Sequence, residues 1–181
     1  GFGSGFVMVN QLPVSIPTDL AGTSADMAIE HDLAWSLLFD AGRYVAVVSK
    51  RDAAMTVFDF AELKGDDHGV TWVALADGVL YATLGGHRMT GVAKAIAVSL
   101  TDGKVIWQSD TDVCNSQNFL VHGSHLVCGY AGEESSLTVL SRLDGTTVSR
   151  LPLELQPQYI AQEGGRLLLR GDMKDQTFTI K

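Results

Sequence analysis

The chain repeats part of its own sequence, and this repeat constrains the fold more than any other feature. Residues 35–44 and residues 72–81 align without a gap, 37 positions apart. Tryptophan, leucine, aspartate and tyrosine occupy the same four places in both copies. Repeats of this length are supersecondary units that bury their apolar faces only by stacking on one another. The sequence therefore predicts an array of similar units.

A turn glycine precedes an apolar strand at four places in the chain. The glycines are spaced 36, 45 and 42 residues apart, which is the length range of a four-stranded β-propeller blade. The glycines and their strands are Gly42 with 44–48, Gly78 with 79–84, Gly123 with 125–130, and Gly165 with 166–169. The first two strands are apolar on both faces, as expected where sheets cover both sides.

A second apolar strand follows each of the first three, at 55–60, 95–100 and 137–141. Asp102-Gly103 and Asp144-Gly145 then lead into a further strand, and Asp-Gly is a strong hairpin signal because glycine accepts a positive φ. The last repeat stops at 177–181, where the outer part of a blade would be missing. We expect an all-β fold: a β-propeller of about four four-stranded blades, or the C-terminal part of a larger propeller. Residues 1–181 are expected to form one domain, with 1–5 as a linker or cloning scar.

Residues 95–107 resemble the repeat of quinoprotein-like propellers, the pyrroloquinoline-quinone type. That repeat has a glycine turn, an apolar strand, alanine and aliphatic residues, Asp/Thr-Gly and a closing tryptophan. The match is best over 78–107 and partial over 123–149, where Ser149 stands in the tryptophan place. The resemblance implies a propeller of usually seven or eight blades, whereas this chain has room for about four. Kelch-like repeats are the alternative, because Gly85-Gly86 follows a tyrosine, but this double glycine occurs at that place only once.

Two segments decide how the array begins and ends. Residues 26–39 carry apolar residues at helical spacing, yet 35–44 belongs to the repeat, so we expect a strand from Ala34 onward with a short helix or turn before it. In a closed four-bladed ring, Phe6–Val9 would pair with the strand near Phe178–Ile180 and complete the last blade.

The net charge of -8 and the absence of any basic cluster exclude nucleic acid as a partner. No apolar run is long enough to insert into a membrane. Cys114 and Cys128 are either two buried free thiols, the simpler expectation, or a disulfide that links consecutive blades in an exported protein. His122 and His125 lie near these cysteines, but they flank a hairpin turn, so no metal is expected.

His87, Arg88 and Lys94 are the candidate ligand-binding residues. They lie in or next to the glycine-rich connection of the best-matching repeat, and loops at the ends of a propeller commonly carry its binding function. Their charge suits an anionic ligand. Three tryptophans, Trp35, Trp72 and Trp107, are expected to pack in the core between blades.

The chain has no nucleophile elbow, phosphate loop, zincin motif or dinucleotide fingerprint. The residues that hold the cofactor in quinoprotein enzymes have no counterparts here, so no cofactor is expected. The predicted function is a non-catalytic scaffold that binds a protein partner or a small ligand at its loops, in an exported or cell-envelope protein. The alternatives are part of a propeller enzyme, either a quinoprotein-type oxidoreductase or a polysaccharide-active enzyme, and a purely structural module of a surface protein.

Overall fold

The computed structural model describes residues 6–9, 12–15, 25–30, 34–39, 44–49, 55–64, 69–85, 93–171 and 175–179. The chain forms two compact units, residues 1–70 and residues 71–181. Strands dominate both units, and the one helix of the described residues has four residues. The expectation of an all-β fold is confirmed.

The first unit contains a short hairpin and a four-stranded antiparallel sheet, here called the first sheet. The hairpin pairs β1 (Phe6–Val9) with β2 (Leu12–Ser15). The first sheet has the order β3 (Ala25–Glu30), β4 (Ala34–Phe39), β5 (Tyr44–Ser49) and β6 (Met55–Asp59). Helix α1 (Ala61–Lys64) follows β6. Residues 44–47 of β5 are buried, as the apolar run over both faces of this strand predicts.

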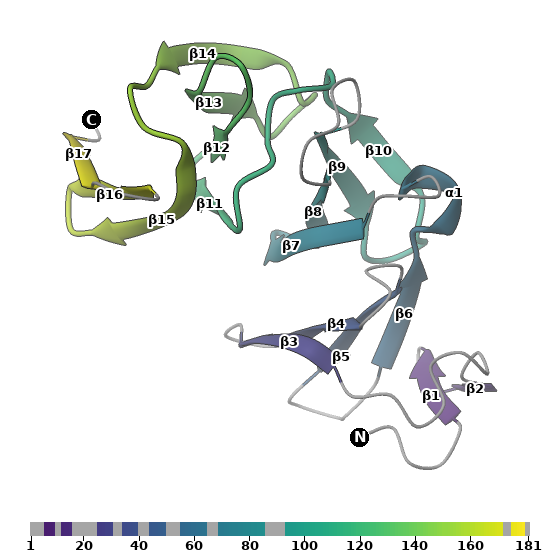
Figure 1. Cartoon of the computed structure of the whole chain (residues 1–181). Helices are drawn as coiled ribbons and strands as arrows, with labels where there is room; N and C mark the ends of the chain where they lie inside the picture. The colour runs from purple at the N-terminus through teal and green to yellow at the C-terminus, as the bar shows by residue number, and fades with distance from the viewer. Residues whose placement is uncertain are drawn as a thin grey trace. The chain divides into compact units, whose positions relative to one another are not determined.

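The second unit contains three antiparallel meanders (Figure 1). The second sheet is β7 (Gly69–Ala76), β8 (Val79–Gly85), β9 (Lys94–Ser99) and β10 (Val105–Gln108). The third sheet is β11 (Phe119–His122), β12 (His125–Tyr130), β13 (Ser136–Ser141) and β14 (Thr147–Pro152). The fourth sheet has three strands: β15 (Pro157–Glu163), β16 (Arg166–Gly171) and β17 (Asp175–Thr179). Successive four-stranded meanders are the blades that the repeat predicts.

One expectation about the N-terminal part is wrong. Residues 25–30 form strand β3 rather than a helix or turn, because they pair along their length with β4. Helical spacing over so short a stretch does not outweigh a partner strand. Residues 6–9 pair with 12–15, and their expected pairing with a strand near 178–180 stays a prediction. Only two residues separate β1 from β2, so this local pairing costs little chain entropy.

Two apolar clusters lie between the sheets of the second unit. The cluster between the second and third sheets includes Tyr81, Trp107 and Leu140. The cluster between the third and fourth sheets includes Leu137, Ile160 and Leu167. Burial of strand faces on both sides of the third sheet is the packing expected of a blade inside a stack.

Candidate functional site

The connections of the second unit gather at two ends of its sheets. In an antiparallel meander, successive connections alternate between opposite ends of the strands. The tight turns inside each sheet therefore lie at one end, here called the hairpin end. The chain passes between sheets at the other end, the loop end, through residues 109–118 and 153–156. Residues 131–135, which connect β12 to β13, also lie at the loop end.

The three predicted ligand residues are only partly described. His87 and Arg88 lie outside the described residues, in the connection from β8 to β9. Lys94 begins β9, and its Nζ donates a hydrogen bond to Oε1 of Gln108 at 2.7 Å. The charge of Lys94 is thus used in a contact between neighbouring strands. The role of these residues in ligand binding stays a prediction.

A disulfide joins Cys114, in the connection 109–118, to Cys128 on β12. Their Cα atoms are 5.5 Å apart, and each residue is 1% exposed. The bond ties the connection that arrives from the second sheet to the middle of the third sheet. It closes a short chain loop and so restricts the unfolded chain as well as the connection.

Two asparagine side chains hold the remainder of this connection. Each side-chain amide bonds to both the N–H and the C=O of one residue, as a backbone peptide group would. Asn115 accepts from the N–H of Ala131 at 2.7 Å and donates to its carbonyl oxygen at 2.8 Å. Asn118, which is 3% exposed, accepts from the N–H of Ile160 and donates to its carbonyl oxygen, both at 2.8 Å. A planar amide has the donor and acceptor needed for both bonds. The connection thereby binds both the third and the fourth sheet.

An open groove of about 700 Å³ lies at the loop end of the third sheet. Its walls come from two segments and one strand residue: 132–136, 152–154 with Gln156, and Arg150. Arg150 donates from Nε to Oγ of Ser136 at 3.0 Å and from Nη2 to the carbonyl oxygen of Asp112 at 2.7 Å. Its guanidinium also lies 5.2 Å from the centre of the Tyr130 ring. Arg150 therefore forms part of the groove wall, and its contacts with Ser136, Asp112 and Tyr130 hold its side chain in place.

The other charged residues of the groove wall are acidic. Glu133, Glu134 and Glu154 line it together with Arg150, so the wall carries three carboxylates and one guanidinium. Beneath the guanidinium, burial raises the pKa of Tyr130 above its ordinary value of 10.0, and the carboxylate of Asp112 adds to this effect. The phenol remains protonated at neutral pH and adds no charge of its own. The charged residues that line the groove therefore carry a net negative formal charge.

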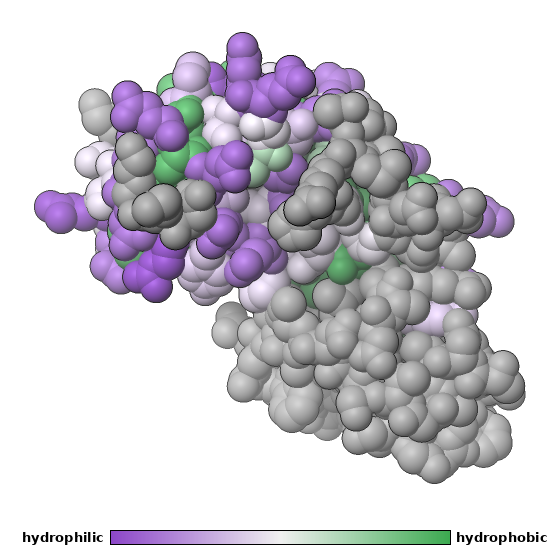
Figure 2. Space-filling view, viewed as in Figure 1, coloured by the Kyte–Doolittle hydropathy of each residue, from purple (hydrophilic) through white to green (hydrophobic). Residues whose placement is uncertain are grey.

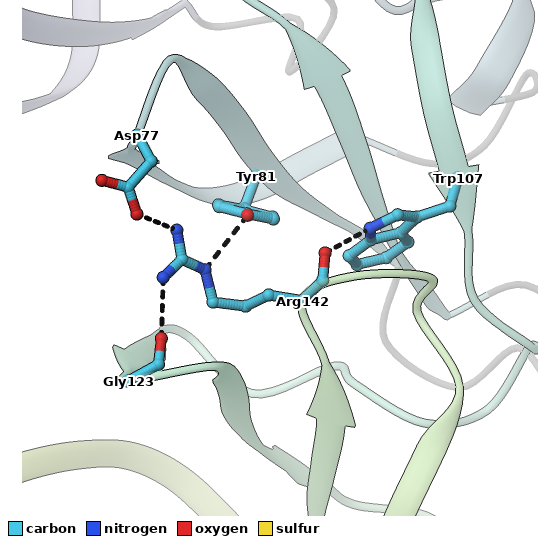
Figure 3. Close-up of polar contacts among 5 residues, drawn as sticks. All are labelled: Asp77, Tyr81, Trp107, Gly123 and Arg142. Atoms are coloured by element: carbon cyan, nitrogen blue, oxygen red, sulfur yellow. Dashed lines mark hydrogen bonds and ion pairs between the residues drawn. The ribbon is translucent and has the colours of Figure 1, made fainter.

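At the hairpin end, Arg142 ties the second sheet to the third (Figure 3). Its Nε donates to the Tyr81 hydroxyl at 3.1 Å, and Nη1 donates to the carbonyl oxygen of Gly123 at 2.7 Å. Nη2 forms an ion pair with Asp77 at 2.8 Å, and the guanidinium lies 5.3 Å from the centre of the Tyr81 ring. Burial lowers the pKa of Arg142, but hydrogen bonds to Tyr81 and Asp77 outweigh this, and the net shift is upward. The side chain is permanently charged and structural.

Trp107 adds a further contact between the second and third sheets. Its Nε1 donates to the backbone carbonyl oxygen of Arg142 at 2.8 Å, and the residue is 8% exposed (Figure 3). The ring lies against Gly145, where a Cβ atom would overlap the indole. The expectation that Trp107 packs between blades is confirmed. Trp72 packs beside the same cluster, while the side chain of Trp35 lies outside the described residues.

The sequence alone predicted neither the groove nor the backbone hydrogen bonds of Asn115 and Asn118. A signal was present in the connection, where two asparagines three positions apart frame Ser116 and Gln117. Within the described residues, no three His, Cys, Asp or Glu side chains converge as a metal site would require. The helix of the described part of the chain is not one that can span a membrane.

Comparison with known proteins gives the fold. No protein-family model matches the chain, and no curated protein matches it in sequence. Among solved structures, the computationally designed Ika4 protein is similar, with a TM-score of 0.62 and 10% identity, over 88% of this chain and 93% of that one. Hydrazine synthase from Kuenenia stuttgartiensis gives a TM-score of 0.57 at 10% identity, over 76% of this chain and 40% of that one.

A quinohemoprotein alcohol dehydrogenase from Pseudomonas putida HK5 is also similar, with a TM-score of 0.53 and 15% identity, over 78% of this chain and 27% of that one. This chain thus spans less than half of either natural enzyme. Identities this low show the fold alone, and the β-propeller architecture is confirmed.

Proposed function

We propose that this chain is a non-catalytic β-propeller module that binds a protein partner in the acidic groove of its third sheet. One observation supports the proposal above the others: Arg150 is held by Ser136 and by the carbonyl oxygen of Asp112, while three carboxylates line the same groove. A concave surface with excess negative charge is complementary to a basic segment of a partner.

The groove is supported by a rigid base, as a binding surface on loops needs to be. Its first wall begins at Gly132, directly after Ala131, which Asn115 holds through two hydrogen bonds. The disulfide at Cys114 fixes the residue before that asparagine. Little entropy is then lost by the protein when a partner binds.

The proposed partner is a protein segment that contains lysine or arginine. The net charge of -8 speeds the approach of a cationic partner and repels anionic ones. An exported or cell-envelope location fits the disulfide, because such bonds persist in oxidising compartments. Alkylation of the protein as isolated from cells, followed by a thiol count in denaturant, tests this location: two reactive thiols would contradict it.

The binding test uses fluorescent peptides of one length and three compositions: lysine- and arginine-rich, acidic, and neutral. The basic peptide should bind best at low salt and lose affinity as salt is added, since exposed charges are screened. Replacing Glu133 and Glu134 together by glutamine should weaken binding of the basic peptide by roughly tenfold, the effect of two lost charge contacts. Glu163→Gln, at the hairpin end of the fourth sheet, is the matched control.

Two results would contradict the proposal. One is a neutral peptide that binds as tightly as the basic one, and the other is a double variant that binds the basic peptide as well as the Glu163→Gln control does. Stoichiometric binding of pyrroloquinoline quinone with Ca²⁺ would instead support the enzyme alternative. Failure of every peptide to bind would favour a purely structural module.

A further inference from the structure

Arg150 brings a guanidinium to the wall of the groove with part of its hydrogen-bonding capacity unused. A guanidinium has five N–H donors. One donor at Nε goes to Oγ of Ser136, and one at Nη2 goes to the carbonyl oxygen of Asp112. In the part of the chain that the structure describes, no acceptor takes either hydrogen of Nη1 or the second hydrogen of Nη2. Three donors therefore remain on a residue that lines an open groove.

The guanidinium of Arg150 is also held in place before any ligand arrives. Besides its two hydrogen bonds, it lies 5.2 Å from the centre of the Tyr130 ring, a cation–π contact. Ser136 and Tyr130 are themselves buried, with 4% and 8% of their surface exposed, so packing fixes both supports. An arginine that is already ordered loses little side-chain entropy when it binds a ligand.

The remaining donors of Arg150 suit a carboxylate. The two terminal nitrogens of a guanidinium form a planar fork of N–H groups that matches the two oxygens of a carboxylate. Glu133 and Glu134 line the same groove, yet among the described residues neither forms an ion pair with Arg150. A phosphate would bring about two negative charges into this groove. The singly charged carboxylate therefore fits the acidic surroundings better.

The groove does not favour a carboxylate that arrives alone. Glu133, Glu134 and Glu154 line the wall, and like charges repel. A basic side chain next to the carboxylate offsets this repulsion, because it contacts the glutamates while the carboxylate contacts Arg150. Hydrophilic side chains occupy much of the visible surface over the third and fourth sheets (Figure 2). Two signs of charge on the groove wall thus select two signs of charge on the ligand.

We propose that Arg150 binds a carboxylate of the partner, next to the lysine or arginine residues that contact the glutamates. This inference rests on the proposed function, because it divides the same groove into a part for cations and a part for a carboxylate. The carboxylate is either the C-terminus of the partner or an aspartate or glutamate side chain, since both present the same two oxygens. Arg150 is then the residue that distinguishes a segment of mixed charge from a purely basic one.

The test compares four fluorescent peptides that share one lysine- and arginine-rich core. Two of them differ only at the C-terminus, which is a free carboxylate or an amide. The other two end in an amide and carry glutamate or glutamine after the core. The net charge of -8 attracts the more basic member of each pair, so without a carboxylate site the amide and glutamine peptides should bind more tightly. With the site, one carboxylate peptide should bind roughly fivefold more tightly than its uncharged counterpart, and that pair identifies the source.

The contribution of Arg150 is tested with Arg150→Gln, which should remove the preference for the carboxylate. Arg166→Gln is the matched control, because Arg166 is an exposed arginine on β16 that does not line the groove. Both variants change the net charge of the protein equally, and the control should keep the preference of the wild type. The comparison of the four peptides on the wild-type protein does not depend on the folding of either variant.

The outcomes separate this inference from the proposed function. If the amide and glutamine peptides bind but neither carboxylate raises the affinity, the carboxylate site is wrong and the groove for a basic segment stands. If the preference survives in Arg150→Gln, the carboxylate binds elsewhere and its assignment to Arg150 is wrong. If none of the four peptides binds, both the proposed function and this inference are wrong.

Discussion

The contact between Trp107 and Gly145 gives a sharp prediction because the chain supplies its own control. Both Gly145 and Gly78 have backbone angles in the left-handed region, with φ of 76° and 74°. A Cβ at Gly145 would overlap the indole ring, whereas a Cβ at Gly78 would have no heavy atom within 4 Å. Alanine at the two positions therefore causes the same backbone strain but different crowding.

The expected magnitudes follow from these two terms. A left-handed alanine costs about 1–2 kcal/mol, which is the whole effect expected for Gly78→Ala. Crowding of a packed side chain adds about 1–3 kcal/mol at Gly145. The free energy of unfolding should thus fall by about 1.5 kcal/mol for Gly78→Ala and by about 3.5 kcal/mol for Gly145→Ala. For a chain of this size, these values lower Tm by about 4 °C and about 10 °C.

Urea unfolding followed by tryptophan fluorescence measures both variants, with Tm from calorimetry as a second reading. In a Trp107→Leu background, the cost of Gly145→Ala should fall to that of Gly78→Ala, because the indole that it meets is gone. Equal destabilisation by the two alanines in the wild-type background would refute the docking of the indole on Gly145.

Three further predictions concern the second unit. Replacing Cys114 and Cys128 together by alanine should lower the free energy of unfolding by about 3 kcal/mol, given their separation of 14 residues, and a Tm unchanged by dithiothreitol in the wild type would argue against it. Asn118→Ala should cost about 2–4 kcal/mol in urea unfolding, because it leaves the N–H and C=O of Ile160 buried and unpaired; normal hydrogen-exchange protection of Ile160 in the variant would contradict this. A backbone hydrogen bond lowers the pKa of Asp144 below its ordinary value of 3.8, so its contribution is present above pH 3.8 and is lost as the pH falls through the lower folded value. Asp144→Asn should flatten the fall of the urea midpoint over that acid range, and identical profiles of variant and wild type would show that the bond does not matter.

The strands of the second unit were predictable because their signals are local. The third-sheet strand at 125–130 was predicted with its observed bounds, since a glycine turn begins it and apolar residues fill it. The Asp-Gly turns at 102–103 and 144–145 were likewise found, and both glycines have a positive φ. Turn chemistry and apolar runs are properties of neighbouring residues, so one sequence suffices to read them.

The site residues depend on contacts that neighbouring residues do not encode. Arg142 meets Asp77 across 65 positions, and Asn118 meets Ile160 across 42. A lone arginine after a strand or an asparagine in a loop reads as an ordinary surface residue until the sheets are stacked. The same limit explains Phe6–Val9, which is short enough to pair with either a local or a distant strand.

The two arginines of the β13–β14 hairpin determine how the sheets of the second unit can move. Arg142 fastens the third sheet to the second at the hairpin end, and Arg150 fastens it to the arriving connection at the loop end. Because these contacts hold the third sheet at both of its ends, the second and third sheets should move as one body. Toward the fourth sheet, Asn118 holds the loop end, while Gln162 and His122 meet at the hairpin end at only 3.5 Å. The fourth sheet should therefore be held to the third more firmly at its loop end than at its hairpin end.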